Sequence, residues 1–175
     1  NIGIAAGAIK GAKKATGKYL LFLNPDTIVK KDTVSKSVKY LDIHSSVTVL
    51  GCKTLNKDGS LQFSCGHFPT ITNIIFYKHL IRNSGFYRKN QATDWVSGAF
   101  MLVRRGIFEK LNGFDEKYFM YTEDVDFCYR VKKSGCKVIY YPGASIIHLD
   151  EGKLPSRHFL KTFHMLRGFI RFFLK

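Results

Sequence analysis

Apolar residues change between helical and strand spacing several times along the chain, and these changes predict an α/β order of elements. Over residues 1–16 the apolar positions recur at helical spacing, and Gly17 follows as the C-cap of the predicted helix. Residues 19–23 are a short apolar run of the kind that forms buried parallel strands. A helix over residues 31–43 follows. In α/β sheets with this strand–loop–helix order, ligands collect beyond the carboxyl ends of the strands.

The rest of the chain alternates in the same way between strands, turns and helices. Asp58-Gly59 is a favourable hairpin dipeptide and predicts a tight turn between two strands. Strands are predicted over residues 47–51, 61–68, 94–103, 137–141 and 144–148, and helices over residues 71–82, 104–111, 122–133 and 155–174. The polar segment 83–93 is either a mobile lid or acceptor loop, or a plain surface connection.

The last predicted helix combines a broad apolar face with a strongly basic remainder. Every charged residue from 153 to 175 is Lys or Arg. The apolar positions of the face are Phe159, Phe163, Leu166, Phe169, Ile170 and Phe173. A basic amphipathic helix of this kind either lies on a membrane of anionic lipid or packs against its own domain. The sequence leaves both alternatives open.

The composition is that of one folded domain. A chain of 175 residues with 45% hydrophobic residues buries a real core and is not disordered. It has no apolar run of about 18 residues, so we expect no transmembrane span. Its first residues lack the pattern of a signal peptide. The four cysteines show neither zinc spacing nor a Cys-x-x-Cys pair, which predicts reduced core thiols and a cytoplasmic protein.

The net charge of +15 favours anionic partners. Nucleic acid, nucleotide phosphates and anionic lipid all meet that description. Because basic residues concentrate in an amphipathic tail, a membrane surface is favoured over a nucleic-acid groove. No nucleic-acid-binding motif accompanies the charge.

The acidic residues gather in one stretch, from Gly113 to Arg130, which holds five of the thirteen carboxylates. Aromatic residues surround them, and a carboxylate in apolar surroundings is costly unless it meets a cation, a metal or hydrogen-bond donors. Thr122 is the predicted N-cap of a helix whose first turn contains Glu123 and Asp124. We interpret the stretch as one wall of an active site. Favourable capping of the helix is the simpler alternative for the two acids.

Three chemical features stand at predicted strand or helix ends: Asp26, the Glu123-Asp124 pair and His148. Oxygen ligands with one imidazole suit Mg²⁺ or Mn²⁺ better than a structural zinc. So few protein ligands would need substrate phosphates to complete the shell of the ion. The pattern therefore predicts a site for a diphosphate leaving group, in which the metal stabilises developing negative charge.

A series of short signatures occurs in order along nearly the whole chain. They are Asn1-x-Gly3 with Gly11 and Gly17, Leu23-Asn24-Pro25-Asp26, Asp58-Gly59-Ser60, Trp95-Val96-Ser97-Gly98-Ala99, Gly113-Phe114-Asp115-Glu116, Tyr121-Thr122-Glu123-Asp124-Val125-Asp126 with Arg130, and Pro142 with His148. In these signatures the chain resembles family 2 glycosyltransferases of the GT-A fold, particularly the bacterial rhamnosyltransferase-like branch.

This resemblance implies a fold and an activity. The fold is α/β, a truncated GT-A, Rossmann-like mixed sheet flanked by helices over residues 1–152, followed by the basic amphipathic helix over residues 153–175. The implied activity is the inverting transfer of a sugar, with rhamnose suggested by the branch. The donor would be a dTDP- or UDP-sugar, and the acceptor a hydroxyl of a glycan or lipid-linked molecule. The expected setting is cell-surface polysaccharide or glycolipid synthesis at the cytoplasmic face of the membrane.

The resemblance also carries roles to individual residues. Asp124 matches the general base that deprotonates the acceptor hydroxyl, and Glu123 is expected to orient the acceptor. Asp26 matches the ligand of the metal that bridges the donor diphosphate, with Asn24 in place of the first carboxylate of that motif. His148 matches a late metal-contacting histidine. The further candidates for substrate contact are Asn1, Gly3, Trp95, Gly98 and Arg130, in addition to Asn24.

Each role has a structural alternative. Asp26 would also suit the cap of a turn or helix, and His148 would also suit an ordinary strand end. Asp126 and Arg130 lie four residues apart on one helix face, so we interpret them mainly as a structural pair. Arg130, like Lys10, would otherwise neutralise phosphate charge. Trp95 fits the core as well as a cleft wall.

The chain departs from the family pattern in two places. The first βαβ units of the family, which hold the nucleotide base and ribose, would precede Asn1, and we expect this chain to lack them. Ile9 stands where relatives usually have an asparagine facing the nucleotide. The missing strands predict an exposed sheet edge through which two copies would pair. A non-catalytic binding or assembly module is therefore the first alternative function, and a nucleic-acid-binding domain is less favoured.

Overall fold

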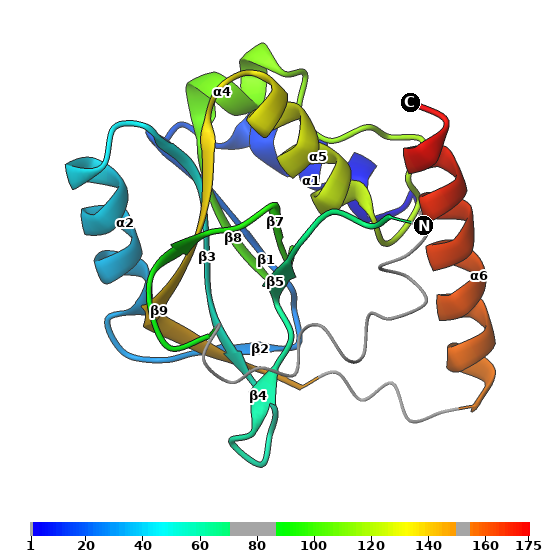
Figure 1. Ribbon diagram of the computed structural model, residues 1–175, viewed down its shortest axis with the longest axis horizontal. Helices are drawn as coiled ribbons and strands as arrows, with labels where there is room; N and C mark the ends of the chain where they lie inside the picture. The colour runs from blue at the N-terminus through cyan, green and yellow to red at the C-terminus, as the bar shows by residue number, and fades with distance from the viewer. Residues whose placement is uncertain (1, 71–86, 150–154) are drawn as a thin grey trace.

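The computed structural model describes residues 2–70, 87–149 and 155–175, with the side chains of residues 155–159 and 161 left aside. The central mixed sheet has the order β1-β8-β3-β9-β2 (Figure 1). These strands are β1 (Tyr19–Leu23), β8 (Phe100–Arg104), β3 (Val47–Leu55), β9 (Lys137–His148) and β2 (Thr27–Val29). Two short strands extend it, because β4 (Leu61–Gln62) pairs with β3 and β6 (Gln91–Ala92) pairs with β9. A separate small sheet joins β5 (Cys65–Gly66) to β7 (Trp95–Val96).

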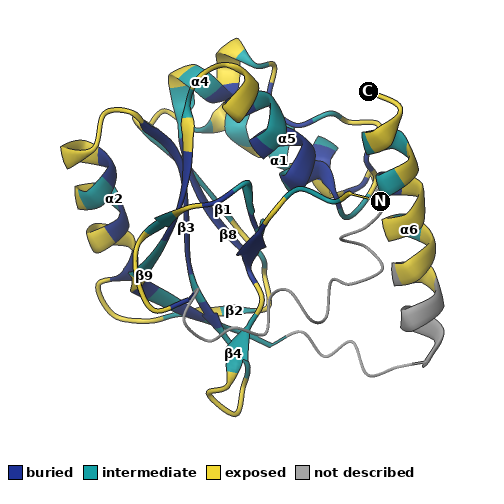
Figure 2. Ribbon diagram, in the orientation of Figure 1, coloured by how far each residue is buried: buried dark blue, intermediate teal, exposed yellow. Residues whose placement is uncertain are grey.

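Helices cover both faces of this sheet. The helices α1 (Ile4–Lys14), α4 (Arg105–Lys110) and α5 (Glu123–Lys133) lie on one face, and α2 (Thr33–Ile43) lies on the other (Figure 1). Alternate residues of β8 serve the two faces: Met101 packs with the α5 side and Leu102 packs with the α2 side. Both clusters are buried, as the dark blue sheet interior in Figure 2 shows. The predicted α/β fold with helices on both sides is confirmed.

Several strand predictions need correction, and the short strands β2 and β6 were not predicted. The run 94–103 is two strands, β7 and β8, separated by Ser97-Gly98-Ala99. The segment 61–68 is likewise divided between β4 and β5. Conversely, 137–141 and 144–148 form the single strand β9, whose register against β3 shifts at the Pro142-Gly143 step. Finally, β1 pairs antiparallel with β8, although its apolar run predicted a parallel strand. The run is apolar because α1 and α4 cover it, which an antiparallel strand allows equally well.

The helix predictions agree more closely with the structure. The helices α1, α2, α4 and α5 form where helical spacing predicted them, and the tail is the helix α6 (Pro155–Phe173). The predicted helix over 71–82 and part of the loop over 83–93 lie outside the described residues. Three of the four cysteines are buried and Cys136 is half-buried, as predicted for core thiols. None of the described helices is both long enough and apolar enough to cross a membrane.

The turn between β7 and β8 brings backbone groups close to the ends of β1 and α5. Ser97 accepts a hydrogen bond from the backbone N–H of Phe100 at 3.3 Å, and Ala99 accepts one from Asn24 at 3.3 Å. The chain therefore leaves the sheet at Gly98 and rejoins it beside the end of β1. This turn brings the N–H of Gly98 to the start of α5, where it meets Asp124.

Candidate active site

A cleft of about 810 Å³ lies between α1, the end of β1 and the start of α5. It collects most of the residues that the sequence singled out. The predicted site residues that line it are Gly3, Asn24, Asp26, Gly98, Glu123, Asp124 and His148. Asn1 lies outside the described residues. Segments far apart in the sequence thus meet at one place.

Asp124 is held by backbone donors from two segments. Its Oδ2 accepts a hydrogen bond from the N–H of Gly98 at 2.9 Å, and its Oδ1 accepts one from Val125 at 2.8 Å. Burial raises the pKa of Asp124, and these two hydrogen bonds oppose the rise. The bond to Val125 lies within the first turn of α5, whereas the bond to Gly98 joins this turn to the segment between β7 and β8. Asp124 thus has the place of a favourable acid in the first turn of a helix, and its role in a reaction stays a prediction.

Glu123 is buried beside Asp124 and is only 6% exposed. Its Oε2 has no hydrogen-bond partner within the part of the chain that the structure describes. Burial and the neighbouring charge of Asp124 raise the pKa of Glu123 to about 8. A neutral carboxylic acid at this position can donate a hydrogen bond into the cleft, which an ionised one cannot.

Two consecutive residues in the left-handed region place this acid pair. Tyr121 has φ 65° and Thr122 has φ 71°, and neither is glycine. Thr122 precedes α5 as predicted, but its side chain makes no capping hydrogen bond. A non-glycine residue in this region carries strain and needs support from its surroundings. The acid pair therefore sits on a backbone that the packing around it must hold in place.

The start of α1 supplies part of that support. The N–H of Ile4 donates to the carbonyl of Phe119 at 2.8 Å. Gly3 has φ 86°, and a Cβ there would lie 2.6 Å from the same carbonyl oxygen. Gly3 lines the cleft, but its identity is explained by this close approach of two backbones.

A second polar group stands where β2 pairs with β9. His148 Nδ1 lies 2.7 Å from Gln62 Oε1, and an amide oxygen there requires Nδ1 to carry the proton. The other ring nitrogen, Nε2, faces Asp26 Oδ1 at 3.2 Å and Asn24 Nδ2 at 3.2 Å. An imidazole nitrogen beside a carboxylate is stabilised either by a proton on that nitrogen or by a cation bound to both groups. Oxygen and imidazole donors in this arrangement fit a divalent cation.

The protein supplies only part of a metal shell. Within residues 2–70, 87–149 and 155–175, no cluster of three or more His, Cys, Asp or Glu side chains is arranged to hold a metal ion. Asp26 and His148 would need oxygen ligands from a bound molecule to complete the shell. Gln62, which orients the imidazole, is a contributor that sequence reasoning missed. Its strand β4 reaches His148 only through the shared neighbour β3, and no local pattern predicts such a pairing.

Trp95 and Arg130 do not line the cleft. The Nε1 of Trp95 donates to the carbonyl of His67 at 2.9 Å, and its ring packs on the core. Arg130 donates to Asp126 at 2.9 Å and to the carbonyl of Leu111 at 2.8 Å. Both side chains are thus engaged in structural contacts, and for Arg130 this is the ion pair that its spacing predicted.

Replacing Glu123 by Gln is expected to raise the stability of the protein at alkaline pH. The raised pKa means that the unfolded chain releases this proton near the ordinary value of 4.5, whereas the folded chain keeps it to about 8. Wild-type stability therefore falls as the pH rises through this range, and the Glu123→Gln variant escapes that loss. We expect its melting temperature to be higher by on the order of 5 °C at pH 9 and equal to wild type at pH 4.

The measurement is thermal unfolding followed by circular dichroism across this pH range. Glu109→Gln, which changes an exposed glutamate of α4, is the matched control and should follow the wild type throughout. Equal melting temperatures of Glu123→Gln and wild type at pH 9 would show that Glu123 titrates normally.

Comparisons with known proteins agree with this geometry. A family model described as "Glycosyltransferase like family 2" matches residues 3–163. The rhamnosyltransferase WbbL of Escherichia coli is 35% identical over 156 residues, which cover 85% of this chain and 59% of the relative. An N-acetylglucosaminyl-diphospho-decaprenol L-rhamnosyltransferase of Mycobacterium tuberculosis is 45% identical over 67 residues, which cover 37% of this chain and 22% of that protein.

Two solved structures share the fold at low sequence identity. The mannosyltransferase PcManGT from Pyrobaculum calidifontis, in complex with GDP-Man and Mn²⁺, aligns with a TM-score of 0.67 and 16% identity. The alignment covers 99% of this chain and 44% of that one. GalNAc-T7 with UDP, GalNAc and Mn²⁺ aligns with a TM-score of 0.62 and 16% identity, over 87% of this chain and 32% of the other. Both are GT-A glycosyltransferases.

Proposed function

The chain belongs to the glycosyltransferase-like family 2, in its rhamnosyltransferase-like branch, and from this premise we propose that it transfers a sugar from a nucleotide diphosphate to an acceptor hydroxyl with inversion. The observation that carries the proposal is the single cleft in which Asp124, Asp26 and His148 all lie. The chain spans 59% of the length of its Escherichia coli relative. The donor, the acceptor and the catalytic turnover of this chain are therefore proposed.

In the proposed reaction Asp124 is the general base. The acceptor oxygen forms a bond to the anomeric carbon while the bond from that carbon to the diphosphate oxygen breaks. The hydroxyl proton passes to Asp124, whose carboxylate is aimed by the N–H groups of Gly98 and Val125. Glu123, in its neutral form, donates a hydrogen bond that orients the acceptor. The raised pKa of Glu123 supports this role.

Asp26 and His148 are the residues that would hold Mg²⁺ or Mn²⁺. Such an ion would offset the negative charge that develops on the leaving diphosphate. The fit rests on Nε2 of His148, which lies 3.2 Å from the carboxylate of Asp26. Asn24 adds an amide beside them without a further charge. The Mn²⁺ in the two solved glycosyltransferase complexes supports the same choice of metal.

The names of the relatives support a narrower proposal for the substrates. Rhamnose from a dTDP- or UDP-linked donor is the proposed sugar, and a glycan or lipid-linked molecule is the proposed acceptor. The product would enter cell-surface polysaccharide or glycolipid synthesis at the cytoplasmic face of the membrane. Self-association through β1, which ends the described sheet, stays a prediction.

The proposed division is a catalytic part over residues 1–152 and the basic helix over residues 153–175. One side of α6 packs on the domain, where Gly168 is buried, and the other side exposes Phe163, Leu166 and Phe173 (Figure 2). The two sequence alternatives, a packed helix and a membrane-facing helix, are therefore compatible. We propose peripheral contact of the exposed side with anionic lipid.

The experiment that tests the function is metal-dependent nucleotide binding. Isothermal titration of the purified protein with UDP or dTDP is expected to show binding that Mn²⁺ strengthens. Asp26→Ala should lower the Mn²⁺-dependent affinity about tenfold, because the ion loses one of its two protein ligands. Glu109→Ala removes an exposed carboxylate elsewhere and should bind as the wild type does.

Two results would contradict the proposal in different ways. Equal Mn²⁺ dependence in Asp26→Ala and wild type would remove Asp26 from the metal site. An absence of nucleotide binding by the wild-type chain would instead favour the non-catalytic binding module.

A further inference from the structure

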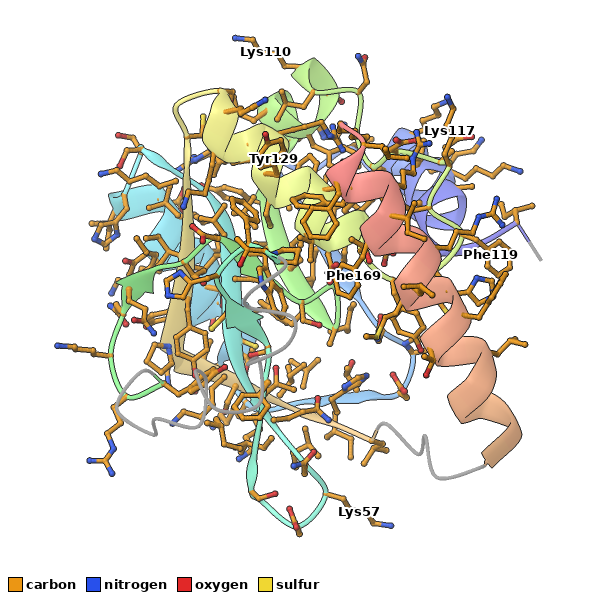
Figure 3. The ribbon with its side chains drawn as sticks, turned by 45° about the vertical axis from the view of Figure 1, so that its right-hand side comes forward. Lys57, Lys110, Lys117, Phe119, Tyr129 and Phe169 are labelled. Carbon is orange, nitrogen blue, oxygen red and sulfur yellow. The ribbon has the colours of Figure 1, made fainter. Side chains whose placement is uncertain are left out.

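A second groove, of about 1110 Å³, runs along α6. Its other wall is the loop 116–120, which leads into the acid pair of the active-site cleft. Figure 3 shows Lys117 and Phe119 of this loop beside the helix. Met120 lines both the groove and the cleft, so the two spaces adjoin. Neither the proposed chemistry nor the metal site uses this groove.

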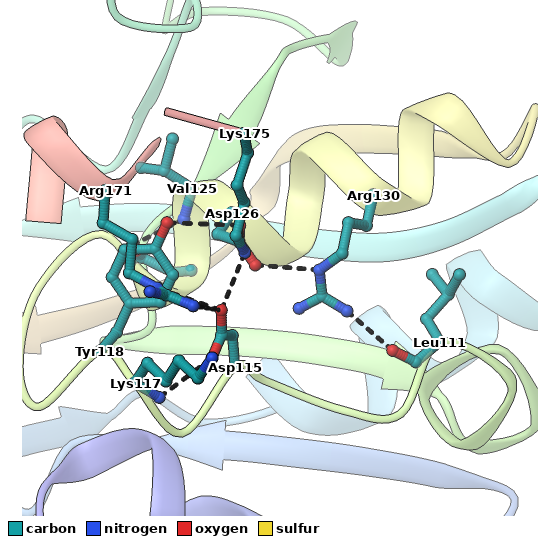
Figure 4. Close-up of polar contacts among 10 residues, drawn as sticks. Leu111, Asp115, Lys117, Tyr118, Val125, Asp126, Arg130, Arg171 and Lys175 are labelled. Atoms are coloured by element: carbon teal, nitrogen blue, oxygen red, sulfur yellow. Dashed lines mark hydrogen bonds and ion pairs between the residues drawn. The ribbon is translucent and has the colours of Figure 1, made fainter. Parts of the chain in front are cut away.

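The wall formed by α6 is fixed to the domain. Gly168 is buried, and a Cβ there would lie 2.5 Å from Thr122 Oγ1. Arg171 of α6 and Lys175, which follows the helix, reach Asp115 at 2.7 Å and 2.9 Å (Figure 4). Burial opposes the ionisation of Asp115, but the hydrogen bonds from these two cations outweigh it and hold its pKa well below the usual range. The groove is therefore a formed feature with a held wall.

The lining of the groove combines positive charge with apolar surface. Lys117 and Arg167 make no ion pair with any other residue in the described ranges. Glu116 is the one acid among the lining residues that the structure describes. The apolar part is strongly exposed: Leu160 at 58%, Ile170 at 53% and Leu174 at 82%. Exposed apolar surface next to unpaired cations indicates a ligand that carries both an anionic group and a hydrocarbon chain.

We propose that this groove binds the phosphorylated end of a lipid-linked acceptor, a phosphate or diphosphate ester of a long-chain alcohol. The inference rests on the proposed function and names the substrate class for it. The cations Lys117 and Arg167 would meet the phosphate, and Leu160, Ile170 and Leu174 would cover the first part of the chain. A sugar attached to the phosphate would then extend past Met120 toward Asp124. A free phosphate leaves the apolar wall unused, and a neutral lipid leaves the cations unused.

The experiment measures binding of farnesyl diphosphate to the purified protein by isothermal titration. EDTA is present, so that a metal-dependent diphosphate contact in the cleft does not contribute. Inorganic diphosphate and farnesol are titrated in parallel as probes of the head group and of the chain alone. We expect farnesyl diphosphate to bind more than about tenfold tighter than either, because only it meets both walls.

Matched variants locate the site. Arg167→Glu should weaken farnesyl diphosphate binding about tenfold. Lys57→Glu makes a similar charge change at the far hairpin tip and should have no effect (Figure 3). Leu174→Ser should weaken the binding of farnesyl diphosphate but not of inorganic diphosphate, whereas Ile43→Ser, at an exposed position of α2, should weaken neither. All four positions are exposed, so these variants should fold.

Several outcomes would overturn the proposal. Equal affinity for farnesyl diphosphate and inorganic diphosphate would show that the apolar wall does not bind the hydrocarbon chain. Equal effects of Arg167→Glu and Lys57→Glu would show that the ligand does not bind in the groove. A third arm uses vesicles of equal parts phosphatidylcholine and phosphatidylglycerol. Binding to these vesicles without binding of soluble farnesyl diphosphate would replace the acceptor site with a bilayer-docking surface.

Failure of the proposed function has a separate signature. UDP or dTDP binding with Mn²⁺ is measured on the same protein samples. Loss of lipid binding in Arg167→Glu with unchanged nucleotide binding supports the groove. Absent nucleotide binding in the wild type speaks against the glycosyl-transfer proposal, whatever the result with farnesyl diphosphate.

Discussion

An Asp124→Asn variant is expected to transfer sugar about a thousandfold more slowly than the wild type while still binding nucleotide. A general base contributes roughly this factor, and an amide cannot take up the acceptor proton. The hydrogen bonds to the site should persist, because an Asn oxygen can still accept from Gly98. The measurements are kcat with a nucleotide-sugar donor and nucleotide affinity by titration.

The raised pKa of Asp124 gives the same experiment a second readout. Burial favours the protonated form, so the wild-type rate should rise as the pH passes above the pKa of this carboxylate. The residual rate of Asp124→Asn should lack that rise. Asp94→Asn, which alters a carboxylate bonded to Phe68 and Lys132 outside the cleft, is the matched control. Turnover near the wild-type rate in Asp124→Asn would remove the base assignment.

Local patterns in the sequence predicted most of the helices and the acid pair. The start of α5 at Glu123 follows from acids in a first turn, and the hairpin at Asp58-Gly59 follows from a turn dipeptide. Both depend on residues that are close in sequence. A shared site for Asp26 and His148 was predicted from their places at element ends and from the family resemblance. The β2–β9 pairing that joins them was not predicted, because it spans most of the chain.

Other features depend on packing that no local pattern encodes. Threonine is a residue type favoured at N-caps, yet Thr122 takes a left-handed conformation and its side chain makes no capping hydrogen bond. Contacts with α1 and α6 hold the loop in this conformation. Glycine inside a helix is usually unfavourable, but a Cβ at Gly168 would lie only 2.5 Å from Thr122 Oγ1. The apolar run of β1 does not reveal the direction of the strand, because that direction is set by the pairing with β8.

The packing of α6 shows that a strongly basic tail can still be attached to the domain. Its apolar spacing suggested one broad face, but the structure divides that face. Phe172 contacts Phe68 and Tyr129 of the domain, whereas Phe163 and Leu166 are exposed. Two of its cations are used inward, on the acidic stretch that contains Asp115 and Asp126 (Figure 4). Sequence position alone does not separate the inward cations from Arg167, which lines the groove.

The same stretch contains the ion pair whose loss should destabilise the fold most. The side chain of Asp126 is fully buried, and Arg130 Nε donates to it at 2.9 Å. Tyr118 also donates to Asp126 at 3.3 Å, and Lys175 contacts the carboxylate from the chain end (Figure 4). Arg130 additionally donates to the carbonyl of Leu111 at 2.8 Å. Removing the guanidinium would leave a buried charge with fewer partners and a carbonyl without this donor.

Arg130→Met is therefore expected to lower the free energy of unfolding by about 3 kcal/mol, because breaking a buried pair on one side costs far more than the pair itself contributes. Lys175 keeps the loss at the lower end of the usual range. Urea unfolding measures it, with Lys132→Met as control on the same helix, where the exposed pair with Asp94 should contribute less than about 1 kcal/mol. The double variant Asp126→Leu with Arg130→Met should recover part of the loss, since no uncompensated charge is then buried. If Arg130→Met lost no more stability than Lys132→Met, the pair would not support the helix that carries Asp124.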